Sequence, residues 1–170
     1  MNVKAGESRY CRWGASSYRS SFDRKITMKQ GRLAVIDGLS NQYVRGASLA
    51  THPALFNLDS QVAVVGTPSN GSGNSRHINF KDSNFKSHLS STEDGLIKIS
   101  WDEDYQIIGA TVIGDCASEI ITPISLAIEF KAKLQELANF YPPHPSKSEI
   151  VFTLLREIEY RMIEKNDYSI

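Results

Sequence analysis

The chain has 170 residues, of which 41% are hydrophobic, and this is enough to build the core of one domain. Its 19 basic and 19 acidic residues cancel, and beyond residue 45 the lysines and arginines are scattered, so no nucleic-acid partner is expected. No apolar run approaches the roughly 18 residues of a membrane span, so no membrane partner is expected either. Residues 1–25 lack the apolar middle of a secretory signal, and Cys11 and Cys116 form no CxxC, so we expect a cytoplasmic protein.

The first half of the chain contains few regular patterns. Residues 1–28 are polar and are expected to form an irregular N-terminal tail. Residues 27–40 have the spacing of a helix that Gly38 would close. Residues 49–66 are typical of two strands joined by a turn. A loop rich in glycine, serine and asparagine follows, and the alternation over residues 76–86 predicts a further strand.

Residues 95–114 give the clearest local pattern, which is that of a β-hairpin. Ile97, Ile99 and Trp101 recur at every second position, so they share one face of a strand. The sequence "DEDY" then supplies turn residues, and the isoleucine-rich run that ends at Ile113 returns as the second strand.

Two helical patterns follow the hairpin. The first, over residues 115–140, can be capped by Asp115 or Ser118, and Pro123 is expected to kink or delay it. The second is predicted over Lys147–Met162, where apolar residues repeat with the 3.6-residue period of a helix. Strands followed by helices indicate an α+β fold, in which helices pack on one side of an antiparallel sheet.

The sequence "HPSKSE" at 144–149 has two interpretations. In the structural one, Ser146 and Glu149 form a capping box at the start of the last helix, and prolines hold the chain extended on both sides of His144. In the chemical one, His144 is a general acid–base, and Glu149 orients its imidazole and stabilises its charge. A histidine and a glutamate at this spacing do not decide between the two.

The other candidate groups form no recognisable site. His52, His77 and His88 lie in separate segments without HxH or HxxxH spacing, so no metal site is expected. Cys116 follows Asp115 near a helix start, and a packed or inert thiol is expected because the acid opposes activation by the helix N-terminus. The loop "GTPSNGSG" matches neither GxGxxG nor a P-loop, so phosphate binding is unsupported.

Five short motifs occur in order between residues 95 and 149: "GLIKI", "IIGATVIGD", "ASEII", "LAIEF" and "HPSKSE". Together they resemble the C-terminal dimerisation domain of the FAD-dependent pyridine nucleotide-disulfide oxidoreductases, such as dihydrolipoamide dehydrogenase, glutathione reductase and mercuric reductase. Upstream, "QGRLAV" resembles the end of that family's FAD domain, and "PALFNLDSQVAVVG" resembles one of its strands. The resemblance implies a remnant of the FAD domain at residues 29–48 and a dimerisation domain at residues 49–165.

In that family the histidine and glutamate of this motif act on the thiol–disulfide pair of the other subunit, beside its flavin. The resemblance therefore implies catalytic roles for His144 and Glu149, in which the histidine takes or returns a thiol proton and the glutamate orients it. It also implies that Pro145 lies near a flavin and that the His144–Pro145 bond is cis.

The implied partners are a second copy of the chain, as a homodimer, or FAD and NAD domains of the same enzyme. Surplus aromatic residues support a dimer. Phe152 lies off the main stripe of the last helix, and Phe140, Tyr141 and Tyr160 are near it. We expect these aromatic residues to be exposed and to be covered by a twofold partner.

Other parts of the family pattern are absent from the sequence, which has no GxGxxG for FAD or NAD(P)H and no redox CxxxxC. We therefore expect neither FAD nor NAD(P)H to bind this chain alone, and no activity from it. The predicted function is the dimerisation domain of a flavin-dependent NAD(P)H:disulfide oxidoreductase, with its substrate left open. Alternatives are a stand-alone dimerising interaction module without redox activity, and an unrelated α+β enzyme that uses His144.

Overall fold

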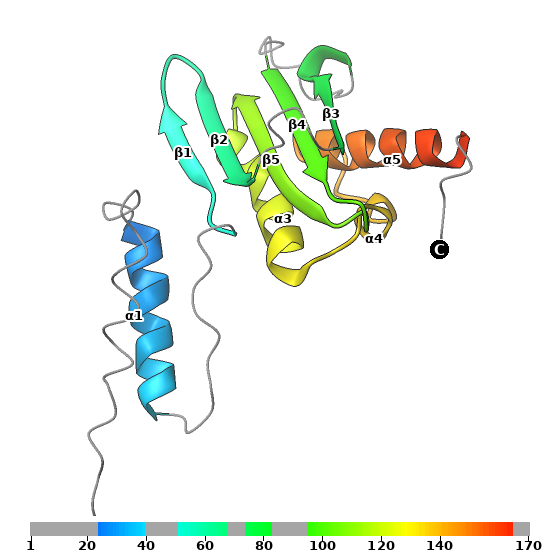
Figure 1. Ribbon diagram of the computed structural model, residues 1–170. Helices are drawn as coiled ribbons and strands as arrows, with labels where there is room; N and C mark the ends of the chain where they lie inside the picture. The colour runs from blue at the N-terminus through cyan, green and yellow to red at the C-terminus, as the bar shows by residue number, and fades with distance from the viewer. Residues whose placement is uncertain (1–23, 40–50, 68–73, 83–94, 165–170) are drawn as a thin grey trace, which may run out of the picture. The chain divides into compact units, whose positions relative to one another are not determined.

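The computed structural model describes residues 24–39, 51–67, 74–82 and 95–164 (Figure 1). The chain divides into two compact units, residues 1–49 and residues 50–170. None of the helices in the described ranges combines the length and the apolar character needed to cross a membrane.

The first unit contains the helix α1, Arg24–Leu39. The helix predicted over residues 27–40 is therefore present. It begins earlier, within the stretch assigned to the irregular tail, and it runs through Gly38 instead of closing there. A glycine inside a helix costs only about 1 kcal/mol, so one glycine near the end does not terminate it.

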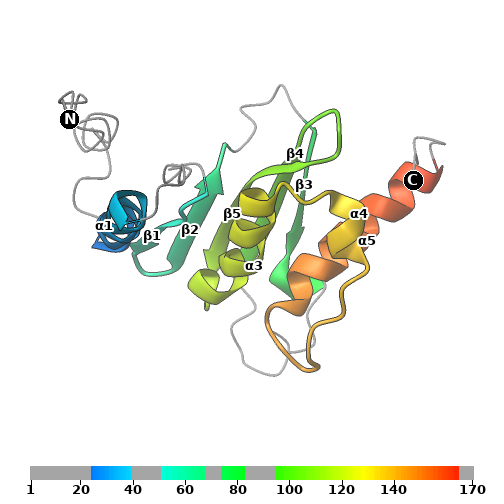
Figure 2. The ribbon, with the colours of Figure 1, turned by 90° about the horizontal axis from the view of Figure 1, so that it is seen from below.

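The second unit contains a five-stranded antiparallel sheet in the order β1-β2-β5-β4-β3 (Figures 1 and 2). The strands are β1 (Ala54–Asn57), β2 (Gln61–Gly66), β3 (Asn74–Asn79), β4 (Gly95–Trp101) and β5 (Ile107–Gly114). The two strands predicted within residues 49–66 and the hairpin of residues 95–114 are confirmed.

The strand predicted over residues 76–86 ends early. β3 stops at Asn79, and a 3-10 turn, η2 (Phe80–Asp82), follows it. Phe80 leaves the strand because its ring is buried against Gly95, where an added Cβ would lie 2.4 Å from the ring. Residues 83–86 of the prediction lie outside the described residues.

The turn of the β4–β5 hairpin is organised by Asp102. Its Oδ1 accepts hydrogen bonds from the amides of Asp104, at 3.0 Å, and Gln106, at 2.9 Å. Tyr105 completes the turn with a left-handed φ of 62°. An aspartate that bonds the amides just after it is a common way to build a tight turn, which explains why "DEDY" joins these strands.

Three helices follow the sheet: α3 (Ala117–Phe130), α4 (Leu134–Ala138) and α5 (Glu149–Glu164). The N-cap of α3 is Cys116, whose side chain makes no capping bond, so the predicted caps Asp115 and Ser118 are wrong. Pro123 lies inside α3 and does not delay its start. The single helical run predicted over residues 115–140 is broken at Lys131, which has a left-handed φ of 54°.

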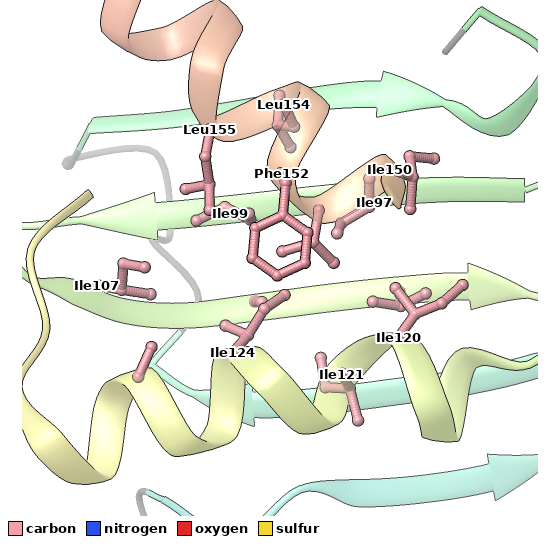
Figure 3. Close-up of a cluster of buried hydrophobic side chains, with 14 of the residues drawn as sticks. Ile97, Ile99, Ile107, Ile120, Ile121, Ile124, Ile150, Phe152, Leu154 and Leu155 are labelled. Carbon is pink, nitrogen blue, oxygen red and sulfur yellow. The ribbon is translucent and has the colours of Figure 1, made fainter. Parts of the chain in front are cut away.

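The hydrophobic core lies between one face of the sheet and the helices (Figure 3). Strand pairing sets Ile97 opposite Val112 and Ile99 opposite Ala110, and all four side chains are buried. Isoleucines of α3 and apolar residues of α5 lie over these strands, where they meet in a single cluster. The predicted α+β fold, with helices on one side of an antiparallel sheet, is confirmed.

The edge strand β3 is joined to α5 by an ion pair. Arg76 pairs with Ile99 of β4, so its side chain leaves the sheet on the core-facing side. The guanidinium donates to Glu157 Oε1 from Nε, at 3.1 Å, and from Nη2. Both side chains are about one-third exposed, at 31% and 35%, so the pair lies at the rim of the core.

Candidate functional site

The segment between α4 and α5 carries His144, and Glu149 is the first residue of α5. Pro142, Pro143 and Pro145 each lack an N–H and have a fixed φ, so little regular structure can form there. The His144–Pro145 bond is cis, as the resemblance implied. The His144 side chain is 65% exposed, so the fold presents the imidazole at the surface.

His144 and Glu149 are in direct contact. The imidazole Nδ1 lies 2.8 Å from Glu149 Oε2. The other carboxylate oxygen, Oε1, accepts a hydrogen bond from the Ser146 amide at 2.5 Å, and this is the predicted bond of the capping box. One carboxylate therefore holds both the histidine and the entry to the helix, so the two interpretations of "HPSKSE" are compatible.

The helix α5 begins at Glu149, two residues after the predicted start at Lys147. The amides of residues 149–151 donate to carbonyls three residues earlier, at 3.1–3.5 Å, which makes the entry tighter than an α-helix. Glu149 is thus the first helical residue. Because helical side chains lean toward the N-terminus, its carboxylate reaches back to the preceding segment.

The charge on Glu149 decides which imidazole nitrogen can exchange a proton. Burial raises the pKa of the Glu149 carboxyl, but hydrogen bonds to His144 and Ser146 and the charges of His144 and Arg156 lower it below its ordinary value of 4.5. The carboxylate is therefore ionised at neutral pH and can only accept. Nδ1 of His144 consequently carries the hydrogen, and in the neutral ring Nε2 has the lone pair that can take a proton.

A salt bridge ties this segment to the corner between β5 and α3. Lys147 Nζ lies 3.6 Å from Asp115 Oδ2. The corner is sharp, because Gly114 has a φ of 125° and Cys116 a φ of 60°. Sequence reasoning missed this pairing, since nothing in the local pattern connects residues so far apart in the chain.

Aromatic residues attach the same segment to α5. Phe152 is only 4% exposed, so the prediction that it lies on the surface is wrong. Its ring packs against Phe140, with centroids 5.1 Å apart, and the segment thereby helps to cover it. Phe140, Tyr141 and Tyr160 are exposed, as predicted, at 56%, 77% and 69%.

The remaining candidates stay apart from this site. His77 lies on β3 and His52 precedes β1, while His88 lies outside the described residues. Within the described ranges, no group of three or more histidine, cysteine, aspartate or glutamate side chains could hold a metal ion. Cys116 is a free, exposed thiol, so of the two alternatives expected for it, packed or inert, the packed one is wrong and the inert one stays a prediction.

The dyad residues do not line the pocket that the structure shows between β3 and α5. A pocket of about 400 Å³ between β3 and α5 is lined by other residues: Arg76, His77, Ile78, Asn79, Asp82 and Glu157. At the dyad, by contrast, the imidazole is mostly exposed. The dyad is therefore open to approach from outside the domain.

Residues 52–155 match the family model for the dimerisation domain of the pyridine nucleotide-disulphide oxidoreductases. The chain belongs to this family. The match covers the whole sheet, α3, α4 and the first part of α5, and it confirms the resemblance drawn from the five motifs. The parent family depends on FAD and NAD(P), and the matched domain is the one through which its members dimerise.

Curated relatives and solved structures agree with this assignment. The dihydrolipoyl dehydrogenase of Buchnera aphidicola is 30% identical over 106 residues, which are 58% of this chain and 22% of that protein. The crystal structure of LpdA from Mycobacterium tuberculosis superposes with a TM-score of 0.67 and 29% identity over 76% of this chain and 29% of LpdA. The flavoprotein disulfide reductase RclA of Escherichia coli, at 15% identity and a TM-score of 0.66, shares the fold over 79% of this chain and 32% of its own.

The chain thus spans less than a third of these relatives. The catalytic roles of His144 and Glu149, and the nearness of Pro145 to a flavin, stay predictions.

Proposed function

We propose that this dimerisation domain presents His144 and Glu149 as an acid–base dyad to the flavin and dithiol of a partner subunit. The observation that carries the proposal is the 2.8 Å contact between His144 Nδ1 and Glu149 Oε2, in a chain that belongs to a disulfide oxidoreductase family. The parent substrate is a dithiol or disulfide compound whose identity is set outside this domain.

The chemistry assigned to this chain is proton transfer. A thiol approaching His144 gives its proton to Nε2, which leaves the more nucleophilic thiolate. The imidazolium that forms is stabilised by the Glu149 carboxylate at 2.8 Å, and the proton returns to a thiolate in the reverse direction. FAD, when bound to the complete enzyme, supplies the electron transfer.

The outward side of α5 supports presentation at a dimer interface. Glu149, Arg156, Tyr160 and Ile163 follow one another at helical spacings of seven, four and three residues, opposite the buried stripe of the helix. Tyr160 and Ile163 are 69% and 49% exposed. Exposed apolar side chains that continue from the dyad fit contact with a second copy of the chain.

The chain alone is expected to be inactive. Its sequence contains no GxGxxG and no CxxxxC, and the His144 side chain is 65% exposed. Incubation of the purified chain with FAD, NADH and a small disulfide should therefore give no nicotinamide oxidation above the rate without protein.

A domain exchange tests the dyad. Residues 52–164 would replace the matching domain of the Buchnera dihydrolipoyl dehydrogenase, and stopped flow would follow flavin reduction by dihydrolipoamide and by NADH separately. His144→Gln should slow the dithiol reaction by about 10²–10⁴-fold, since general acid–base catalysis contributes that much, and leave reduction by NADH within about twofold. An equal dithiol rate in the exchanged enzyme and its His144→Gln variant would exclude the dyad.

A stand-alone dimerising module is the second candidate function. The observation that favours it is the exposure of Tyr160 and Ile163 on α5, which supports dimerisation whether or not His144 acts as an acid–base. Sedimentation velocity on the 170-residue chain tests dimerisation. Both candidates predict a dimer, but the module alone predicts that His144→Ala changes nothing in the exchanged enzyme.

A further inference from the structure

Arg156 makes two contacts with the segment that leads to His144. Its Nη1 donates a hydrogen bond to the Phe140 carbonyl at 3.3 Å. Its guanidinium also lies over the ring of Tyr141, 4.9 Å from the ring centroid. One side chain of α5 therefore contacts two consecutive residues just before the prolines.

These contacts belong to a series along one side of α5. Glu149 holds His144 and the Ser146 amide, Phe152 packs against Phe140, and Arg156 binds the Phe140 carbonyl and the Tyr141 ring. Positions 149, 152 and 156 are separated by three and four residues, so their side chains lie one above another. Residues 140–146 are called the dyad segment below. The helix α5 thus contacts both ends of this segment.

We propose that Arg156 is a positioning residue for the His144–Glu149 dyad, because it fixes the backbone from which His144 is presented. This inference rests on the proposed function. It gives the dyad a second support, at Phe140 and Tyr141, which precede His144 in the chain, whereas Glu149 follows it.

The prolines explain why a contact at residues 140 and 141 can orient His144. Pro142, Pro143 and Pro145 have fixed φ angles, and the residue before each proline is restricted to extended conformations. A short stiff segment transmits the position of its first residues to its last ones. The position of the exposed His144 side chain is therefore coupled to the contacts at residues 140 and 141.

Arginine suits this role better than lysine. Its planar guanidinium can donate within its plane to a carbonyl while its face stacks on an aromatic ring, whereas an ammonium group offers only a point charge. Its positive charge also contributes to holding the Glu149 carboxyl ionised. We therefore expect Arg156→Lys to retain the charge effect and to lose most of the positional effect.

The experiment uses the 170-residue chain labelled with ¹⁵N. Hydrogen exchange of the Ser146 amide reports whether Glu149 still holds the segment, and ring ¹⁵N shifts of His144 report how far Nδ1 remains the protonated nitrogen. Arg156→Gln should speed exchange at Ser146 by about three- to tenfold and reduce the Nδ1–H tautomer of His144. In Arg156→Lys, the Ser146 amide should recover less than half of the protection from exchange that it loses in Arg156→Gln.

Two controls show that the effect is local and specific. Arg161→Gln removes an arginine of the same helix that pairs with Glu157 at 3.4 Å, and it should leave Ser146 exchange within about twofold of the unaltered chain. The Leu154 amide, deep in α5, should keep its protection in every variant. If Arg156→Gln exposes Leu154, Tyr141→Leu becomes the test, because it removes the ring contact and keeps the helix intact, and it should speed Ser146 exchange about two- to threefold.

Two results would overturn the inference. One is Ser146 exchange and His144 ring shifts that do not change in Arg156→Gln or Tyr141→Leu. The other is an equal effect from Arg161→Gln. Either result leaves the dyad itself standing, because the domain-exchange experiment with His144→Gln tests it independently, and a failure there leaves the local geometry measured by exchange unaffected.

Discussion

The ring centroids of Phe140 and Phe152 lie 5.1 Å apart, and the two ring planes are tilted by 44° against each other. Phe140 is more than half exposed and belongs to the dyad segment, whereas Phe152 is buried in the core of the domain. The contact therefore links the position of the proposed catalytic segment to the packing of α5. A change in the core beneath Phe152 is expected to move His144 as well as to reduce stability.

Phe152→Ala should lower the free energy of unfolding by about 3–5 kcal/mol, because it leaves a cavity beside the sheet and removes the ring contact with Phe140. Urea unfolding at low protein concentration measures the change. Phe130→Ala is the matched control, since Phe130 is 77% exposed, and it should change the free energy by less than about 0.5 kcal/mol. Equal losses in the two variants would contradict the burial of Phe152.

The Arg76–Glu157 ion pair should contribute modestly to stability. A double-mutant cycle with Arg76→Gln and Glu157→Gln is expected to give a coupling of about 0.5–1 kcal/mol, because both side chains are about one-third exposed. The coupling should shrink in about 1 M NaCl, where the Debye length is near 3 Å. The Arg161–Glu157 pair on the same helix is the comparison, with an expected coupling of about 0.3–0.5 kcal/mol.

Glu149 should give the domain a stability that depends on pH in the acid range. Its pKa in the folded chain lies below the ordinary value of 4.5, so folding is favoured when the carboxylate is ionised. That contribution is fully present above pH values near 4.5 and is lost as the pH falls through the lowered pKa. Glu149→Gln should therefore be less stable than the unaltered chain at pH 7, and the difference should shrink toward pH 3.

Thermal unfolding at pH 7, 4 and 3 measures this difference. Glu103→Gln, in the exposed turn of the hairpin, is the matched control. It keeps Glu149, so it should retain the loss of stability at low pH that Glu149 causes. A gap between Glu149→Gln and the unaltered chain that stays constant or widens at low pH would contradict the assignment.

Local patterns predicted the parts of the fold that depend on neighbouring residues. The period-two spacing of Ile97, Ile99 and Trp101 identified β4, and "SKSE" identified the carboxylate that reaches back to the Ser146 amide. The break between α3 and α4 was missed because Lys131, and not the usual glycine, occupies the left-handed position after α3. A lysine there gives no signal in the sequence.

Contacts between distant segments could not be predicted from the sequence alone. Arg76 meets Glu157 only because β3 forms the edge of the sheet and α5 lies beside it. Lys147 meets Asp115 because the corner after β5 folds back toward the dyad segment. The His144–Glu149 contact was accessible because both residues lie within one short motif, and the aromatic and cationic contacts that support the motif became visible only in three dimensions.

Gly66 offers a test of how closely the backbones of β2 and β5 approach each other. It ends β2 with a φ of +71°, and a Cβ added there would lie 2.0 Å from the carbonyl oxygen of Ile108. That oxygen accepts a hydrogen bond from the Thr67 amide at 2.9 Å, so it cannot move away without breaking the β2–β5 contact. Gly66→Ala should therefore destabilise the domain by about 2–4 kcal/mol in urea unfolding.

The matched control for Gly66→Ala is Gly31→Ala in α1, where an added Cβ has no neighbour within 4 Å. Alanine is favoured over glycine inside a helix by about 0.5–1 kcal/mol, so this change should stabilise α1. Gly31→Ala should therefore not lower the urea midpoint, in contrast to Gly66→Ala. If Gly66→Ala unfolded at the same urea concentration as the unaltered chain, β2 would have to end in a conformation that alanine tolerates, and the pairing of Gly66 with Gly109 would be wrong.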